Sequence, residues 1–487
     1  MDAGVGGIEG SVIGDLEGPL AVVDEHGRLQ TIDRRWSFEW GVGVGDRWRV
    51  AHETAGTRRQ RINDAPVYET RLRISGGDVV ARAAVANDGV SRALVVEFEN
   101  VSSDALAVAL VGRAIDGEVS AASDSVSLDG RLWIHPERQA GGVVATSGAR
   151  DPWPEIQDGP DADPVSVRGS EVAAGLVMAL PHRQSVKFQV VVEGRALART
   201  ASPAEIASGW SAVTTDALSV DVADVDLGTA WRRILGDLVV QAGSDDPASA
   251  AEAAPILDIA GLAREADRAR AAVVTAAEAG LLTGVPAVAA LRALLSRDLR
   301  VERVSGIDQL ADLLVSRATG SLDIETVILL ARVLEGSDPK AAADACRLAA
   351  SLDPKRRWQP VTPVAKAAER VLRTLVDDSC VGTSVGVDSI VGTAGDTAEA
   401  GGVRIDLLPE APSEWFGRPV DVRGFGTLWG RVSFSVRWHG HRPALLWERT
   451  GGPDRVELRC LGLDPRWSSF ERHGEALLAE PPRAPGK

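Results

Sequence analysis

Apolar and polar positions alternate with a period of two through the first 205 residues. In the segment 68–74 apolar residues alternate with Glu and Arg, and the segments 94–99 and 186–192 follow the same pattern. This period is typical of strands with one buried face. Turn dipeptides, Gly76-Gly77 and Asp129-Gly130 among them, separate the strands. Many short strands without intervening helical patterns predict an N-terminal antiparallel β-sandwich over residues 1–205.

The period changes to that of amphipathic helices between Asp226 and about residue 376. Apolar side chains then recur at helical spacing, and Asp-Pro and Thr-Pro pairs at 338–339 and 362–363 provide N-caps followed by proline at the first helical position. We count about seven short helices at roughly 20-residue spacing, whose short connections favour antiparallel neighbours. The segment 226–380 is therefore predicted to be an α-helical, α/α domain.

Composition and a return of the strand pattern define the remaining segments of the chain. Residues 206–225 are predicted to be a linker, and 381–402, rich in Gly, Ser and Thr, a second and looser one. Val432, Phe434 and Val436 share one face of a strand, which predicts a small β-domain over 403–479. The Pro-rich tail 480–487 is predicted to be disordered. The fold class is thus multidomain, with α and β parts.

Charge and composition exclude several classes of function. The 487 residues carry a formal net charge of −16, which disfavours nucleic acid as a partner. No apolar run of about 18 residues predicts a membrane span, and the start of the chain lacks the pattern of a signal peptide. Three widely spaced cysteines and the Arg-rich, Ala-rich composition indicate a reduced, cytoplasmic, bacterial protein. No nucleotide, P-loop or zinc-protease motif occurs, so no cofactor and no metal are predicted.

The C-terminal segment 404–448 carries the most specific pattern of the chain. Leu-Leu-Pro at 407–409, Trp-Phe-Gly at 415–417 and Val-Arg-Gly at 422–424 occur in an order and spacing that resemble the small β-domain of glycoside hydrolases built on an (α/α) toroid. The order sandwich, helices, small β-domain is similar to the layout of that family. The resemblance implies carbohydrate as the ligand and a carboxylate as general acid, if the chain is catalytic.

The helical segment departs from that family. A closed toroid has twelve helices, whereas about seven are predicted here, and no carboxylate of this chain matches a catalytic position of the family. The toroid is therefore expected to be partial, and the chain a reduced or degenerate relative. A ring could close by dimerisation, so a homo-oligomer is left open.

Two acidic segments offer the pair of carboxylates that glycoside cleavage needs. The first is 151–163, where Asp151 and Glu155 flank Trp153, a flat apolar surface for a sugar. The second is the predicted loop 243–255, which contains Asp245, Asp246 and Glu252. Glu155 and Asp246 are the catalytic candidates, with Asp151 and Trp153 as substrate-binding residues. The alternative is that both segments are solvated acidic loops.

Three further groups are weaker candidates. Arg357 and Trp358, in a basic segment before a helix, could bind an anionic group, or could simply pack and complement a helix end. His182 and Arg183, at the entry to a strand, could face the helices and contact substrate. His439 and His441 share a strand face but have no third metal ligand nearby, so an ordinary exposed pair is the simpler interpretation.

Two functions follow from these observations. The first is a carbohydrate-binding protein with glycoside-hydrolase-like architecture that hydrolyses or phosphorolyses a glycosidic bond by carboxylate acid–base catalysis. The second is a non-catalytic, degenerate relative that acts as a binding or assembly module. The shortened helical segment and the missing catalytic match favour the second.

Overall fold

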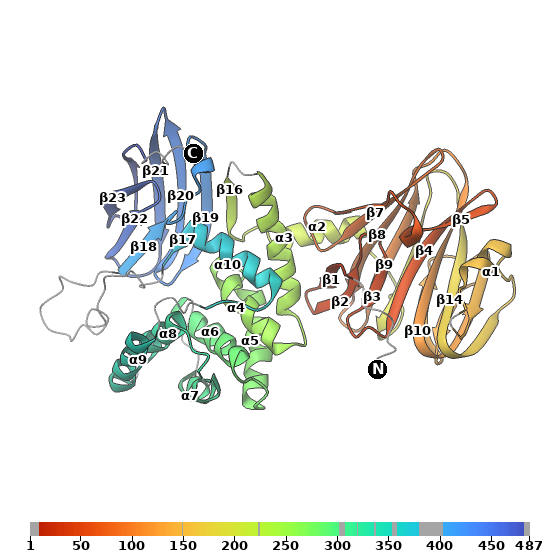
Figure 1. Cartoon of the computed structure of the whole chain (residues 1–487), viewed down its shortest axis with the longest axis horizontal. Coiled ribbons are helices and arrows are strands. Elements are labelled where there is room, and N and C mark those ends of the chain that lie inside the picture. Colours follow the sequence, from red (N-terminus) through yellow and green to blue (C-terminus); the bar gives the residue numbers. More distant parts are fainter. Residues whose placement is uncertain are drawn as a thin grey trace, which may run out of the picture. The chain divides into compact units, whose positions relative to one another are not determined.

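The computed structural model describes residues 9–148, 150–222, 225–300, 307–318, 320–335, 338–352, 358–378 and 403–481 (Figure 1). The chain divides into two compact units, Met1–Val213 and Thr214–Lys487. Each unit is described by itself below.

The first unit is built on one antiparallel sheet of 15 strands. Its main path runs β1-β2-β3-β4-β10-β11-β12-β15-β9-β8-β7-β6, while β5 pairs with β4, β14 with β10, and β13 with β14. The strands are β1 Ser11–Asp15, β2 Gly18–Val23, β3 Leu29–Thr31, β4 Trp36–Val44, β5 Arg47–Val50, β6 Arg58–Arg61, β7 Tyr68–Ile74, β8 Gly77–Asn87, β9 Arg92–Asn100, β10 Leu106–Ala122, β11 Ser125–Leu128, β12 Arg131–Pro136, β13 Gly142–Thr146, β14 Val165–Leu180 and β15 Ser185–Glu193.

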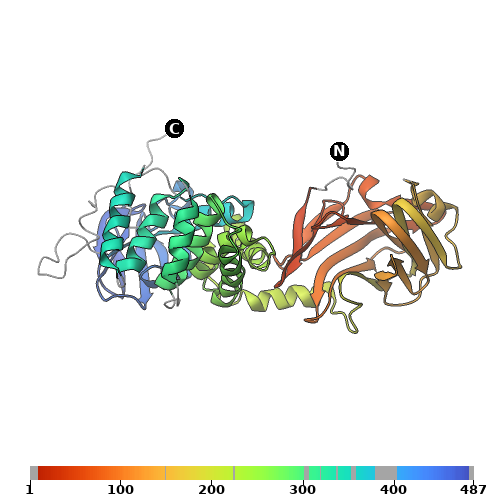
Figure 2. The ribbon, with the colours of Figure 1, turned by 90° about the horizontal axis from the view of Figure 1, so that it is seen from below.

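The sheet curls until its two ends meet (Figure 2). Asp15 at the end of β1 accepts a hydrogen bond from Arg92 of β9 at 2.7 Å, and the Tyr68 hydroxyl of β7 donates to the Val12 carbonyl at 3.3 Å. The curled sheet encloses one large apolar core, in which the rings of Trp40, Phe98 and Phe188 pack in a row with centroids 5.4 and 5.8 Å apart. The predicted antiparallel β-sandwich is confirmed.

One of the predicted turn dipeptides, Asp129-Gly130, separates two strands as expected. Asp129 and Gly130 join β11 to β12 with φ angles of 50° and 73°. Positive φ at both positions is the hairpin conformation that favours Asp-Gly, because its twist matches that of the paired strands.

Two short helices interrupt a region in which the sequence predicts only strands. Helix α1, Trp153–Asp158, forms where a loop is predicted, and α2, Pro203–Val213, lies across the predicted boundary at residue 205. Helix α2 contacts β8 and β9 and belongs to the first unit. Helix α1 has 6 residues, fewer than a helical period needs to become visible, and α2 has 11, about the shortest window that shows one.

The second unit contains an α/α array and two small sheets. The described residues form eight helices here, where about seven are predicted. These helices form two rows, and the predicted partial toroid is confirmed. Helices α4, α6 and α8 contact one another in succession, and α5 contacts α7 beside them. The helices are α3 Val225–Ala242, α4 Pro247–Ala260, α5 Ala263–Glu278, α6 Val285–Arg300, α7 Ile307–Ala318, α8 Ile324–Glu335, α9 Pro339–Ser351 and α10 Pro363–Leu375.

The small β-domain consists of a five-stranded sheet, β16-β19-β20-β21-β24, and a four-stranded sheet, β17-β18-β22-β23. Two of its strands come from other predicted segments: β16 from the predicted linker and β17 from the end of the predicted helical domain. The strands are β16 Ser219–Val222, β17 Val376–Asp377, β18 Val403–Leu407, β19 Val420–Thr427, β20 Gly430–His439, β21 Arg442–Thr450, β22 Val456–Cys460, β23 Asp464–Ser469 and β24 His473–Leu477. As predicted, Val432, Phe434 and Val436 are buried on one face of β20.

Helix α4 anchors the array to the sheets. Gly426 of β19 lies against the last turn of α4, where a Cβ would come within 3.0 Å of the Asp258 and Ile259 carbonyls. No helix among the described residues is long and apolar enough to cross a membrane.

A buried ion pair joins α4 to α5. Arg270 donates to the two carboxylate oxygens of Asp258 at 2.7 and 3.2 Å, and the two side chains are 6% and 0% exposed. Arg270 also contacts Asp267 at 2.6 Å, but that carboxylate is 48% exposed.

We expect Asp258→Ala to lower the free energy of unfolding by about 3–5 kcal/mol, because it leaves a guanidinium buried without its main partner. Urea unfolding followed by circular dichroism measures this loss. Asp267→Ala is the matched control and should cost less than about 1 kcal/mol. Equal losses for the two variants would contradict the assignment of Asp258 as the essential partner.

Candidate functional site

A pocket of about 610 Å³ lies in the first unit, where the inner face of the sheet ends. It is lined by residues from the start of β4, from the middle of β10, and from the β11–β12 hairpin. Ala114, Leu128 and Trp133 belong both to its wall and to the sandwich core. The pocket is therefore an open end of the core rather than a gap between loops.

Two tryptophans form the aromatic part of the wall. Trp133 of β12 is 1% exposed, and its ring meets that of Trp36 of β4 edge-on with centroids 6.1 Å apart. Trp36 is half-buried and so presents part of its ring at the wall. Gly112 of β10 makes room for Trp133, since a Cβ there would lie 2.8 Å from Cη2 of the indole.

Four charged side chains surround the aromatic wall: Arg35, Asp116, Asp129 and Arg131. All four residues are exposed. Asp129 is fixed, because its carboxylate accepts the Glu118 backbone N–H at 2.9 Å. Asp116 and Arg131 have no hydrogen-bonding or ionic side-chain partner within the part of the chain that the structure describes, so their polar groups are available to a ligand.

Sequence reasoning missed this pocket. The clustering of tryptophans in segment 36–48 was a usable signal, but the structure gives its three members different roles. Trp40 is buried in the core, Trp48 packs against Trp153, and Trp36 lines the pocket. The other wall residues come from strands whose pairing is not visible in the local pattern.

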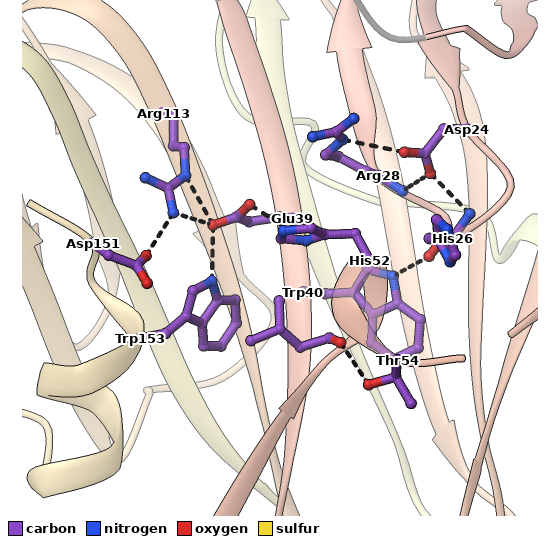
Figure 3. Close-up of polar contacts among 11 residues, drawn as sticks. Asp24, His26, Arg28, Glu39, Trp40, His52, Thr54, Arg113, Asp151 and Trp153 are labelled. Atoms are coloured by element: carbon purple, nitrogen blue, oxygen red, sulfur yellow. Dashed lines mark hydrogen bonds and ion pairs between the residues drawn. The ribbon is translucent and has the colours of Figure 1, made fainter. Parts of the chain in front are cut away.

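The acidic segment 151–163 is brought onto the outer face of β4 and β10 (Figure 3). Asp151 accepts a hydrogen bond from Arg113 at 2.9 Å, and Arg113 also donates to the buried Glu39 at 2.6 and 2.8 Å. Ion pairing with Glu39 and Asp151 outweighs burial and raises the pKa of Arg113. Asp151, whose side chain is 51% exposed, thus forms the outer end of a charge network with Arg113 and Glu39.

Trp153 closes the same network. Its indole N–H donates to Glu39 at 2.9 Å, and its ring is 6% exposed, packed on Gly41 and beside Trp48. Stacking on a sugar requires an open ring face. The buried ring does not provide one, so the predicted sugar-stacking role of Trp153 is replaced by a packing role.

The two catalytic candidates are each engaged locally. Glu155 lies in α1, with its carboxylate 2.9 Å from the Arg150 guanidinium and 30% exposed. Asp246 is the N-cap of α4: its carboxylate accepts the N–H groups of Ala248 and Ser249, each at 3.2 Å. The predicted loop 243–255 is therefore mostly helix. Glu155 belongs to the first unit and Asp246 to the second, so neither unit by itself holds the pair.

Glu252, the other carboxylate weighed in that segment, is 4% exposed. It accepts the N–H groups of Val361 and Thr362, the latter at 2.8 Å, and so caps the start of α10 from within α4. Its role is structural, because it satisfies donors that a helix start leaves unpaired.

Arg357 lies outside the described residues, whereas Trp358 is described and is 4% exposed. One face of the Trp358 ring is covered by Arg292, whose guanidinium carbon is 4.5 Å from the ring centroid. The ring is thus already occupied by a cation of the same unit, which leaves that face closed to a ligand.

His182 and Arg183 form the exposed turn between β14 and β15. The His182 Nδ1 atom contacts the Ser102 carbonyl, and the Arg183 N–H donates to the Asn100 carbonyl at 3.0 Å. His439 and His441 lie at the β20–β21 turn and are exposed. Within the described ranges, no group of three or more His, Cys, Asp or Glu side chains is placed to hold a metal ion.

No protein-family model matches this chain, and no curated protein matches it. Among solved structures, a bacterial glucoamylase complexed with acarbose is similar over 76% of this chain and 69% of its own, at 8% identity and a TM-score of 0.47. A family GH92 α-mannosidase from Bacteroides thetaiotaomicron, in complex with mannoimidazole, is similar over 61% of this chain and 55% of its own, at 9% identity and a TM-score of 0.26. Glycoside hydrolases are thus among the similar structures, the class that the sequence resembles.

We expect Asp246→Ala to lower the free energy of unfolding by about 1 kcal/mol, since it removes the N-cap of α4. Asp246→Asn should keep most of this stabilisation, because Asn also caps helices. Urea unfolding of both variants tests the assignment. A glycosidase activity abolished by Asp246→Asn at unchanged stability would contradict it and return Asp246 to a catalytic role.

Proposed function

We propose that this chain is a carbohydrate-binding protein with glycoside-hydrolase-like architecture, and that its sugar site is the pocket of the first unit. The observation that carries the proposal is one pocket that combines a half-buried Trp36 with a carboxylate, Asp116, and a guanidinium, Arg131, neither of which has a side-chain partner among the described residues.

The chemistry of the wall suits a sugar. A pyranose has an apolar C–H face that packs on an indole ring, and a rim of hydroxyl groups that both donate and accept hydrogen bonds. Asp116 and Asp129 supply acceptors, and Arg131 supplies donors. A few polar groups around an apolar surface are typical of small-ligand sites.

The size of the pocket agrees with this assignment. Ligand pockets range over roughly 300–1,000 Å³, and the volume here is about 610 Å³. This space accommodates a mono- or disaccharide together with ordered water, rather than a long chain enclosed along its length.

We favour a protein that binds a sugar but does not hydrolyse it with the predicted catalytic pair, Glu155 and Asp246. Cleavage needs two carboxylates flanking one bond, about 5–9.5 Å apart. Glu155 is paired with Arg150, and Asp246 is occupied as a helix cap in the other unit. These contacts support the interpretation of the chain as a binding module. The cytoplasmic location, the bacterial source and homo-oligomer formation stay predictions from the sequence.

We expect Trp36→Ala to weaken binding of neutral mono- or disaccharides roughly tenfold, because it removes the apolar surface under the ring. Isothermal titration calorimetry on the full chain measures the change. Trp48→Ala is the matched control, a half-buried tryptophan of the same unit outside the pocket, and should leave the affinity unchanged. Failure of the unaltered protein to bind any sugar, or equal losses for the two variants, would overturn the proposal.

A second substitution tests the polar side of the wall. Asp116→Asn should weaken the same binding roughly fivefold to tenfold, because a charged acceptor is exchanged for a neutral one. Asp163→Asn, an exposed carboxylate outside the pocket, should have no effect. An unchanged affinity in Asp116→Asn would remove this residue from the site.

A further inference from the structure

We infer that the pocket selects a sugar carrying a carboxylate, that is, a uronic acid residue. This inference rests on the proposed function and adds the chemical class of the ligand. The observation behind it is the presence of two guanidinium groups, Arg35 and Arg131, in the wall of one pocket.

Arg131 is the stronger of the two anchors. It is the first residue of β12. It directly follows the hairpin turn formed by Asp129 and Gly130, which both have positive φ angles. Its backbone position is therefore fixed by a paired strand. Its guanidinium has no side-chain or backbone acceptor within the described ranges, although it lines the pocket beside Trp133.

Arg35 reaches the pocket from a different part of the sheet, directly before β4. Its Nε atom lies 3.6 Å from a carboxylate oxygen of Asp33, and the two side chains are 76% and 55% exposed. An ion pair this long and this exposed contributes little stability. A bound anion can therefore replace Asp33 as the partner of the Arg35 guanidinium at a small cost in free energy.

A carboxylate matches these groups in shape as well as in charge. The guanidinium is a planar fork that donates two parallel hydrogen bonds to the two oxygens of a carboxylate. The acceptors Asp116 and Asp129 in the same wall would repel an anionic group placed beside them. They therefore orient the ligand, with its carboxylate toward Arg131 and Arg35 and its hydroxyl groups toward the aspartates.

The net charge of the chain sharpens this argument. With a formal charge of −16, the protein as a whole repels anions. Preferential binding of an acidic sugar would then report a local site rather than general attraction.

The test compares two disaccharides that differ only in the group at C6, cellobiose and the disaccharide of glucuronic acid β-linked to glucose, by calorimetry on the full chain at low salt. We expect the acidic disaccharide to bind roughly tenfold more tightly than cellobiose. Arg131→Gln should weaken binding of the acidic disaccharide much more than binding of cellobiose, and so remove most of this difference. Arg183→Gln, an exposed arginine of the same unit outside the pocket, is the control.

The outcomes separate the two proposals. Equal affinity for both disaccharides, or a preference that survives Arg131→Gln, overturns the inference while the proposed sugar site stands. Binding of a sugar phosphate but not of the acidic disaccharide also overturns it, since it replaces the carboxylate with another anion. If the unaltered protein binds neither disaccharide nor any other sugar, the proposed function fails and the inference fails with it.

Discussion

Side chains alternate between the two faces of the sheet along β4 and β10. Both the pocket on the inner face and the Glu39 charge network on the outer face depend on this constraint. Successive residues of a strand point to opposite faces of a sheet. On β4, Trp36, Phe38 and Trp40 belong to or pack against the sandwich core, whereas Glu39 lies on the other face under Trp153. Because the sheet curls, the inner face ends in a pocket and the outer face is covered by the segment that contains α1.

Glu39 decides what the segment 151–158 can do. A carboxylate that is 5% exposed is costly to bury unless it is paired and hydrogen-bonded. Arg113 and the Trp153 indole N–H supply these bonds, and His52 lies 3.6 Å away on the other side. The acidic and aromatic residues that resemble a sugar site in the sequence are thus used to stabilise a buried charge, and the open aromatic surface belongs to Trp36.

The fold could be predicted from the sequence wherever a local period or a turn defined it. Alternating residues identified strands such as 68–74, and Asp129-Gly130 identified a hairpin with positive φ angles. Short elements whose burial depends on a distant partner were missed. The strand β16 contains only four residues and is placed by pairing with β19, about 200 positions later in the chain. Its residues do alternate, but four residues are the shortest run that indicates a strand, and this run lies in a segment predicted to be a linker.

The candidate site was missed for the same physical reason. Trp36 and Trp133 are neighbours only because β4 pairs with β10, β10 with β11, and β11 with β12. The sequence shows the residue types and the glycine, Gly112, that lets the indole approach, but it does not show that these strands are adjacent.

The charged groups of the helical unit favour the first unit as the place of the proposed binding site. Glu325 of α8 is buried with Arg292 and Arg373, which lie 3.4 and 3.2 Å from its carboxylate. Burial raises the pKa of Glu325 in spite of these two cations. Arg292 also covers Trp358, and Arg373 donates to the Trp358 carbonyl at 3.3 Å. In this cluster the cations, the carboxylate and the aromatic ring contact one another, so a ligand would have to displace several internal contacts to bind there. At the pocket of the first unit, Asp116 and Arg131 make no such contacts with other described residues, so a ligand would displace fewer internal contacts there.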